Sequence, residues 1–324
     1  FLIKNNLLFK NNKIEDMEEL KKLADGIYFG EGPRWHDNKL WFSDFYSHKV
    51  MTLDENNVLE TICEVPNQPS GLGWLPNGDL LIVSMLDRKI LKFADGEISL
   101  HADLSEHVTH KCNDMVVSSD GTAYVGNFGM EDAGESVNTT HLMIVKPDGT
   151  ILKGPDKLLF PNGTVITPDG KELIVGETLG AKLTSFKIDE NGELINRKLW
   201  ARTSPLIFLL IIKFLSSLGF DLSKVDFSKY SKSLHVPDGI CLDEKNGIWI
   251  ASPTSSSVVR IEKGGKVTNT IKTPKNAFAC MLGGKERKTL YVLLSNSSDP
   301  VEAQATPEGE IHSIEVEIPG VGKP

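Results

Sequence analysis

Short apolar runs alternate with tight polar turns along most of the chain. Residues 80–83 (LLIV) follow Pro76-Asn77-Gly78, and residues 173–175 (LIV) follow Pro168-Asp169-Gly170. An Asn-Gly or Asp-Gly pair between two apolar runs is typical of a β-hairpin. A third apolar run often follows the second, as at 89–93, 183–186 and 258–261. The pattern therefore predicts an all-β protein built from several multi-stranded units.

These units repeat along the chain at similar intervals. Turns near residues 38, 78, 121, 170, 247 and 288 lie 40 to 49 residues apart, except for one interval of 77. A period of this length with several strands in each unit is typical of a β-propeller. We expect one domain at 21–324, a six-bladed β-propeller with four-stranded blades. Residues 1–20, rich in Lys, Asn and Glu, are expected to form an N-terminal tail outside the repeat.

The long interval contains an insertion at 203–235, shortly before Asp238. Its apolar run begins after Pro205 and ends at Lys213, well short of the roughly 20 residues that a membrane span needs. Three interpretations remain open. The segment is a hydrophobic helix that caps one mouth of the propeller, an insertion without a packed role such as translated non-coding sequence, or a membrane-associated segment. No membrane partner is expected for the protein as a whole.

Composition narrows the function classes. The net charge is −9 and 24% of the residues are charged, so nucleic acid is not an expected partner, because nucleic acid requires a basic surface. The four cysteines lie far apart, without the spacing of a zinc ribbon. The sequence begins with Phe1, which indicates a fragment or a processed form, and residues 1–13 lack the continuous apolar core of a signal peptide. We therefore expect a cytoplasmic protein.

Oxygen-bearing side chains recur just before the first apolar strand of five units. In a propeller the innermost strands begin at one mouth of the channel, so we expect these side chains to converge there. They are Glu31, Ser70, Asn113, Asn162 and Asp238. In the sixth unit the equivalent position falls near residues 277–280.

Two carboxylates and two amide carbonyls at one point would form a hard-oxygen site. The two negative charges of Glu31 and Asp238 repel each other unless a cation is bound. Such donors suit Ca²⁺, Mg²⁺ or Mn²⁺. The alternative is that the Pro-Asn-Gly at 161–163 and the Pro-Asp-Gly at 237–239 are plain turns, since these residues dominate turns. Their recurrence at one phase with Glu31 favours the metal site.

Other polar residues are weaker candidates. Three of them, Glu177, Asn127 and Ser252, follow apolar strands at comparable places and could line the pocket, although a structural role is favoured for Glu177. We interpret His36, His110 and His235 as surface, loop or turn residues. A Gly-x-Ser-x-Gly elbow, which would indicate a serine hydrolase, does not occur in the sequence.

Together these motifs resemble the SMP-30 (senescence marker protein), gluconolactonase and luciferin-regenerating enzyme family, which includes regucalcin. The resemblance runs from about residue 25 to 295. It rests on the motifs Gly30-Glu-Gly-Pro-Arg-Trp35, Pro69-Ser-Gly-Leu-Gly-Trp74, Asn113-Asp114, Pro161-Asn-Gly163, Pro237-Asp-Gly239 and Cys280-Met-Leu-Gly-Gly284. It implies a six-bladed propeller with one divalent cation that serves the hydrolysis of sugar lactones and related esters.

The resemblance also implies roles for single residues. Glu31, Asn162 and Asp238 would bind the cation, with Ca²⁺ preferred and Zn²⁺, Mn²⁺ or Mg²⁺ as alternatives. Asn113 and Lys111 would bind the substrate, and Lys111 replaces an Arg of the animal regucalcins, which changes a planar fork into a point charge.

The expected function is a metal-dependent lactonase in which the cation polarises the lactone carbonyl and activates water. Asp238 is the preferred base, with Glu31 as the alternative. A non-catalytic calcium-binding or ligand-binding propeller is the alternative function, since a fold does not imply catalysis.

Overall fold

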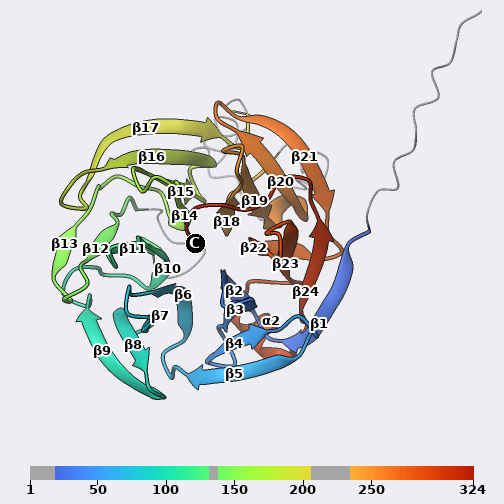
Figure 1. The fold of residues 1–324 in the computed structure, drawn as a ribbon, viewed down its shortest axis with the longest axis horizontal. Coiled ribbons are helices and arrows are strands. Elements are labelled where there is room, and N and C mark those ends of the chain that lie inside the picture. The colour runs from blue at the N-terminus through green and yellow to red at the C-terminus, as the bar shows by residue number, and fades with distance from the viewer. Residues whose placement is uncertain (1–18, 131–137, 206–233) are drawn as a thin grey trace, which may run out of the picture.

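The computed structural model describes residues 19–130, 138–205 and 234–324. In these ranges the chain forms six four-stranded antiparallel sheets, arranged as blades in a ring around a central channel (Figure 1). The predicted six-bladed β-propeller is therefore confirmed. The three interpretations of the insertion concern residues that lie mostly outside the described ranges.

Each blade begins with its innermost strand, next to the channel. Blade 1 consists of β2 (Gly30–His36), β3 (Lys39–Asp44), β4 (Lys49–Leu53) and β5 (Leu59–Glu64), and blade 2 of β6 (Pro69–Trp74), β7 (Leu80–Ser84), β8 (Lys89–Ala94) and β9 (Glu97–Asp103). Blade 3 consists of β10 (Cys112–Val117), β11 (Ala123–Asn127), β12 (Met143–Val145) and β13 (Ile151–Lys153), and blade 4 of β14 (Pro161–Ile166), β15 (Glu172–Glu177), β16 (Lys182–Ile188) and β17 (Leu194–Arg202). Blade 5 consists of β18 (Ile240–Leu242), β19 (Ile248–Ser252), β20 (Ser257–Glu262) and β21 (Lys266–Lys272), and blade 6 of β22 (Asn276–Gly283), β23 (Thr289–Ser295), β24 (Gly309–Glu315) and β1 (Lys21–Ile27).

The Pro-Asn-Gly motif at 76–78 and the Pro-Asp-Gly motif at 168–170 form the predicted hairpin turns. The backbone N–H of Gly78 donates to the carbonyl of Leu75 at 2.9 Å, and that of Gly170 donates to the carbonyl of Thr167 at 2.8 Å. Gly78 has a φ of +95°, in the region that favours glycine. These turns join the first two strands of blades 2 and 4.

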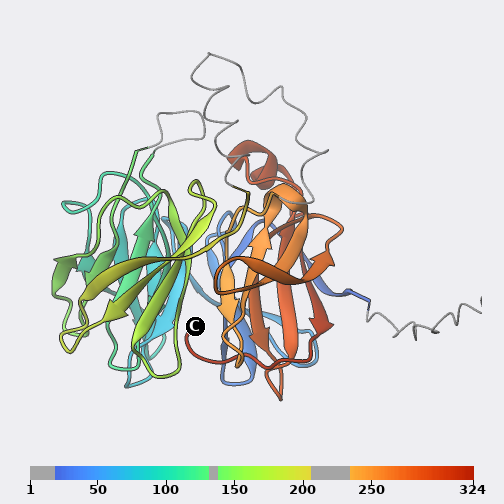
Figure 2. The same ribbon diagram turned by 90° about the horizontal axis from the view of Figure 1, so that it is seen from above.

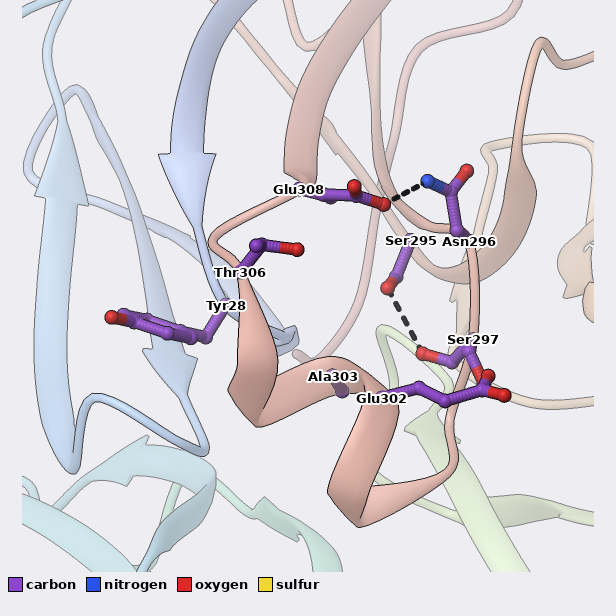
Figure 3. A pocket seen from close by; sticks show the side chains of 8 residues that line it. All are labelled: Tyr28, Ser295, Asn296, Ser297, Glu302, Ala303, Thr306 and Glu308. Carbon is purple, nitrogen blue, oxygen red and sulfur yellow. Dashed lines mark hydrogen bonds between the residues drawn. The ribbon is translucent and has the colours of Figure 1, made fainter.

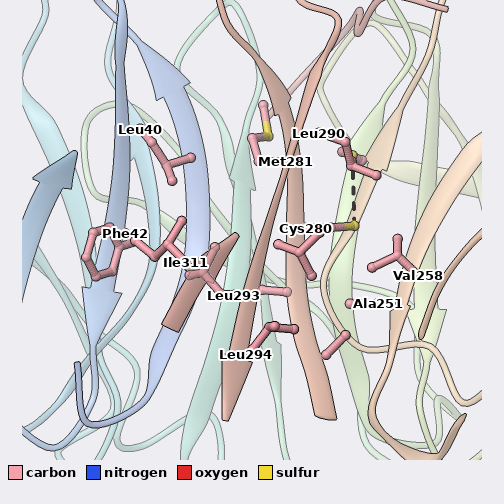
Figure 4. Close-up of a cluster of buried hydrophobic side chains, with 14 of the residues drawn as sticks. Leu40, Phe42, Ala251, Val258, Cys280, Met281, Leu290, Leu293, Leu294 and Ile311 are labelled. Carbon is pink, nitrogen blue, oxygen red and sulfur yellow. Dashed lines mark hydrogen bonds between the residues drawn. The ribbon is translucent and has the colours of Figure 1, made fainter. Parts of the chain in front are cut away.

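Inner strands bury both faces, one against each neighbouring blade. In β7, Leu81 and Val83 belong to a cluster that extends into blade 3, whereas Leu80 and Ile82 belong to a cluster with residues of blade 1. Alternate residues of a strand point to opposite faces, so a continuous apolar run fills two interfaces between blades. Another cluster joins blades 1, 5 and 6, and Figure 4 shows Leu40 there together with other members.

The ring is closed by a strand from the beginning of the chain. Strand β1 pairs antiparallel with β24, with Lys21 opposite Ser313 and Ile27 opposite Gly309. It thus forms the outermost strand of a blade whose other three strands come from the last 50 residues of the sequence. The repeat spacing places residues 21–27 inside the propeller, but it does not assign them to the sixth blade.

A segment near the end of the sequence crosses one end of the channel. Gly320 bridges to Asp243, and Lys323 bridges to Ile166, at the far ends of β18 and β14. The C-terminus lies near the centre of the ring in Figure 1 and towards one end of the channel in Figure 2. The beginnings of the inner strands lie at the opposite end.

The two ends of the insertion meet beside blade 5. The hydroxyls of Thr203 and Ser204 donate to the carbonyl of His235 at 2.5 and 3.0 Å. Among the described residues, no helix is long and apolar enough to span a bilayer.

Candidate metal centre

The predicted site residues all lie at the beginning of innermost strands. The described positions run around the channel from blade 1 to blade 5, and they are Glu31 in β2, Ser70 in β6, Asn113 in β10, Asn162 in β14 and Asp238 just before β18. All five side chains are buried. The repeat phase therefore brings them to one end of the channel, as expected for a propeller.

The innermost strand pairs irregularly with the second strand in blades 1 to 4, next to the predicted site residue of each blade. The register shifts between Glu31 and Arg34, and an equivalent shift occurs in blades 2, 3 and 4. A β-bulge bends a strand and changes the direction in which its side chains point. The bulges thus separate the polar residues at the channel mouth from the apolar residues that follow in the same strand.

Close backbone contact explains the glycines that follow Asn162 and Asp238. A Cβ on Gly163 would lie 2.5 Å from the carbonyl oxygen of Asp238, and one on Gly239 would lie 2.7 Å from the Cα of Ala279. The N–H of Gly163 donates to the Asp238 carbonyl at 3.2 Å. The motif at 161–163 lies in β14, and the glycines of both motifs allow one inner strand to pack closely against the next.

This contact places Asn162 beside Asp238. The Asn162 amide donates from Nδ2 to Asp238 Oδ1 at 2.5 Å and to the Thr178 hydroxyl at 3.3 Å. Thr178 in turn donates to the carbonyl of Pro237 at 2.8 Å. A rotation of the amide by 180° exchanges its nitrogen and oxygen, and would present Oδ1 to the space beside Asp238.

Glu31 and Asp238 form a pair of interacting buried acids. Each residue is 9% exposed. Burial raises the pKa of Asp238 to about 7, and the charge of Asp114 contributes in the same direction. Burial also raises the pKa of Glu31 well above its ordinary value, and the charges of Asp238 and Asp114 raise it further. The cation-free site therefore retains protons that exposed carboxyls would have lost.

Other buried carboxyls in the described part of the chain have compensating partners. Asp114 pairs with Arg34, Asp243 with Arg260, and Glu177 with both Lys182 and Arg197. Asp44 accepts the backbone N–H groups of Tyr28 and Phe29. Glu31 and Asp238 make no ion pair with a described Lys or Arg, and each accepts one hydrogen bond, from Gly32 and from Asn162. Two buried acids without a cationic partner are expected to bind a cation.

Asn113 has a side-chain hydrogen-bond donor that is not satisfied by the described residues. Its Nδ2 atom is buried and has no hydrogen-bond partner among the described residues. Buried amide nitrogens are rarely left in this state, so a ligand is expected to accept from this one. Lys111 is half-buried just before β10, and its carbonyl accepts the N–H of Phe128 at 3.0 Å.

The donor chemistry fits a hard divalent cation. Two carboxylates and an amide carbonyl are oxygen ligands of the kind that Ca²⁺ uses. The described residues contain no cluster of three His, Cys, Asp or Glu side chains that could hold a metal ion. A cation between Glu31 and Asp238 would therefore depend on the Asn162 amide and on water or substrate oxygens.

The remaining candidates have structural roles. Glu177 is fully buried in its ion pairs, as expected. Asn127 donates to the carbonyl of His141 at 2.7 Å and accepts from Thr140, so its amide is satisfied within blade 3. Ser252 accepts the N–H of Val236 at 3.2 Å.

Of the three histidines interpreted as surface, loop or turn residues, His235 lies in a loop. His235 is buried rather than at the surface, and its Nδ1 lies 3.2 Å from the Ser255 hydroxyl. The ends of the insertion meet at its carbonyl, which explains the burial.

A separate pocket of about 280 Å³ lies beside α2 (Pro300–Ala305), a short helix between β23 and β24. Its walls include Tyr28, Ser297, Glu302 and Thr306 (Figure 3). None of the predicted site residues lines it.

Arg34 and Thr178 are neighbours of the site that sequence analysis did not single out. Asp114 appeared there only as the second residue of an Asn-Asp motif. Its position beside Asn113 is the one sequence signal that could have indicated it.

Comparison with known proteins identifies the relatives of this chain. A family model described as "SMP-30/Gluconolactonase/LRE-like region" matches residues 29–296. Regucalcin from Danio rerio is 23% identical over 289 residues, which cover 85% of this chain and 86% of that protein.

Solved structures support the same fold. A regucalcin from Agrobacterium tumefaciens, described as a calcium-binding protein, gives a TM-score of 0.73 at 18% identity and covers 95% of this chain and 97% of that one. A gluconolactonase from Xanthomonas campestris gives a TM-score of 0.65 at 21% identity, with coverages of 93% and 90%.

Proposed function

Because this chain belongs to the SMP-30/gluconolactonase/LRE-like family, we propose that it is a divalent-metal-dependent hydrolase of lactones, with sugar lactones as the substrate class. The observation that carries the proposal is the pair of buried, interacting acids, Glu31 and Asp238, which make no ion pair with a described Lys or Arg; Asp238 also lies beside Asn162. Gluconolactonases among the structural relatives support the choice of substrate.

Glu31, Asn162 and Asp238 would hold the cation, and Ca²⁺ is the preferred ion. A divalent cation supplies a Lewis acid that polarises a carbonyl and lowers the pKa of bound water. The name of the Agrobacterium relative, a calcium-binding protein, supports the choice of ion.

Proton transfer is assigned to Asp238. Lactone hydrolysis breaks the bond between the carbonyl carbon and the ring oxygen and joins the carbon to a water oxygen. One proton must leave the water, and one must reach the ring oxygen. A carboxylate beside the cation is within reach of its water, so Asp238 would accept the first proton and return it to the ring oxygen.

Asn113 and Lys111 are assigned to substrate binding. The Nδ2 of Asn113, which is buried and has no partner in the described ranges, would donate to a substrate oxygen, and the ammonium group of Lys111 would attract hydroxyls or the developing negative charge. Lys offers a point charge, so it selects substrates less strictly by geometry than the planar fork of Arg.

A non-catalytic calcium-binding propeller is the second candidate function. It is favoured by the relatives that carry the name regucalcin, including the solved calcium-binding protein. Under this alternative the same three ligands bind the cation, but no lactone is hydrolysed.

The two functions are separated by assaying the purified protein on gluconolactone and a panel of other lactones, with and without EDTA. Turnover that EDTA abolishes and Ca²⁺ restores supports the hydrolase. Tight Ca²⁺ binding without turnover on any lactone supports the binding protein. Turnover that persists in EDTA would contradict the proposed metal dependence.

A further inference from the structure

Arg34 makes hydrogen bonds to three blades. It lies in β2, three residues after Glu31, and is 3% exposed. Its Nε donates to the carbonyl of Leu72 in blade 2 at 2.9 Å, and its Nη1 donates to the carbonyl of Pro33 at 2.8 Å. Its Nη2 donates to Asp114 Oδ1 at 2.6 Å and to the carbonyl of Met115 at 2.5 Å, both in blade 3. One guanidinium thus connects the inner strands of blades 1, 2 and 3.

Asp114 completes this arrangement on the side of blade 3. Its Oδ1 also accepts the backbone N–H of Met115 at 2.9 Å, which fixes the carboxylate against its own strand. The inner strand of blade 2 leaves space for it, because a Cβ on Gly71 would lie 2.9 Å from the same oxygen. The residue before Asp114 is Asn113, whose amide nitrogen has no hydrogen-bond partner in the described part of the chain.

The ion pair therefore lies between two groups of the proposed site. Arg34 follows the bulge that begins at Glu31, and Asp114 lies within the bulge that begins at Cys112. The charge of Asp114 acts on both Glu31 and Asp238, which indicates that the pair is close to both acids. The charge of Arg34 acts in the opposite direction on Glu31, whose pKa it lowers.

Stability alone is a weak explanation for such a pair. Replacing a buried ion pair with apolar side chains of similar volume is often neutral or stabilising. Lys could not replace Arg34, because an ammonium group cannot donate in the fixed, planar directions that reach Leu72, Asp114 and Met115 together. The geometry of the fork is the property that this position requires.

We propose that Arg34, anchored by Asp114, is a positioning residue that holds Glu31 of blade 1 and Asn113 of blade 3 at a fixed separation across the mouth of the channel. The inference rests on the proposed function, in which Glu31 binds the cation and Asn113 binds the substrate. In this proposal the guanidinium group of Arg34 aligns Glu31 with Asn113 and touches neither the cation nor the substrate.

The test compares this pair with a matched pair elsewhere in the molecule. Arg260 and Asp243 in blade 5 form a buried pair of equal length, 2.6 Å, with side chains that are 4% and 0% exposed. Asp243 lies at the other end of the channel, where it bridges to Gly320. The variants are Arg34→Lys, the double variant Arg34→Met/Asp114→Asn, and the control Arg260→Met/Asp243→Asn. The double variants remove a pair without leaving a charge buried alone.

Three quantities are measured on each variant: the affinity for Ca²⁺ by isothermal titration calorimetry, kcat and KM on gluconolactone, and the thermal midpoint. We expect both Arg34 variants to bind Ca²⁺ about tenfold more weakly and to have a KM raised severalfold. The control should lower the thermal midpoint by about as much as the double variant Arg34→Met/Asp114→Asn does. It should leave Ca²⁺ affinity and KM within about twofold of the wild type. The conservative Arg34→Lys variant keeps the charge, so a loss there is a loss of geometry.

Wild-type Ca²⁺ affinity and KM in a folded Arg34→Lys variant would overturn the positioning role and leave the proposed function intact. Equal losses in the control pair, or Arg34 variants that do not fold, would also overturn it, because the pair would then be structural. A wild-type protein that binds no divalent cation would overturn the proposed function itself. A wild type that binds Ca²⁺ but hydrolyses no lactone leaves the calorimetric comparison as the deciding measurement.

Discussion

At the scale of single residues, the site is defined by what the buried acids lack. Asp114, Asp243 and Glu177 each have a cationic partner, whereas Glu31 and Asp238 have each other. Two buried like charges are unfavourable, so the site either keeps a proton or binds a cation. This balance determines how the proposed centre responds to mutation and to pH.

Replacing Asp238 with Asn tests the ligand assignment. The variant keeps the shape of the side chain but removes one of two charges, so we expect Ca²⁺ affinity to fall at least about 100-fold and lactone turnover to fall to background. Calorimetry and the gluconolactone assay measure both effects. Asp169→Asn, at an exposed hairpin turn, removes the same charge elsewhere and should change neither. Normal Ca²⁺ binding by Asp238→Asn would contradict the assignment.

The raised pKa of Asp238 predicts an unusual pH dependence for the cation-free protein. The folded-state pKa of about 7 lies above the ordinary value of 3.8, so between these values the folded chain holds a proton that the unfolded chain has lost. The stabilising contribution is complete below about pH 4 and is lost as the pH rises towards 7. The shift of Glu31 acts in the same direction.

Urea unfolding in EDTA at pH 5 and pH 7.5 measures this effect. The free energy of unfolding of the wild type, relative to that of Asp238→Asn, should decrease between the two pH values. Ca²⁺ affinity should increase over the same range by up to about tenfold per pH unit for each proton displaced. A difference between the two proteins that is independent of pH would show that Asp238 titrates normally.

The repeat phase was sufficient to predict that Glu31, Asn162 and Asp238 lie at the beginnings of innermost strands, because each blade contributes the same position. The Arg34–Asp114 contact joins residues 80 positions apart in different blades, and no local pattern indicates it. The burial of His235 was also missed, since it depends on the chain returning to Thr203 and Ser204. Phase within a repeat is a local property, whereas the choice of partner depends on packing between blades.

At the scale of elements, each innermost strand serves two functions, one near its beginning and one along the rest of its length. Their later residues are apolar and fill the interfaces between blades, as Val165 does in β14. A polar residue lies near their beginning, as Asn162 does within the irregular stretch between Pro161 and Thr164. Hairpin turns and strand order followed from the sequence, but the bulge in β14 did not, because it lies where the inner strands of blades 4 and 5 meet backbone to backbone at Gly163.

Gly239→Val tests the importance of this contact. The added side chain would overlap Ala279, so we expect a loss of about 1–3 kcal/mol in unfolding free energy together with weaker Ca²⁺ binding, because Asp238 is the adjacent residue. Urea unfolding and calorimetry provide the two measurements. Gly170→Asn is the control, since its Cβ would meet nothing within 4 Å and Asn tolerates its φ of +69°. A Gly239→Val protein as stable as the control would argue against close strand contact.

At the scale of the whole molecule, the ring is fastened at two places. Strand β1 completes blade 6 by pairing with β24, and the segment that contains Gly320 and Lys323 joins blades 4 and 5 at the far end of the channel. The period of the repeat predicted six blades, but it did not assign the first described strand to the last blade. The repeat period describes units that follow one another in sequence, whereas closure of the ring pairs strands from opposite ends of the chain.

Removing β1 tests the closure. Deleting residues 1–27 would leave β24 as an unpaired edge, so we expect a thermal midpoint lower by several degrees and greater aggregation. Deleting only residues 1–18 leaves β1 whole and serves as the control. Scanning calorimetry and light scattering measure the two effects. If both deletions behave alike, the pairing of β1 with β24 does not stabilise the ring.

The pairing of β1 with β24 also has a consequence for biosynthesis. The two strands are separated by about 290 residues of sequence, so β1 leaves the ribosome long before its partner exists. Until translation reaches residue 315, the nascent chain carries an incomplete sixth blade and an open ring. During this interval the exposed strand edges would depend on chaperones for protection.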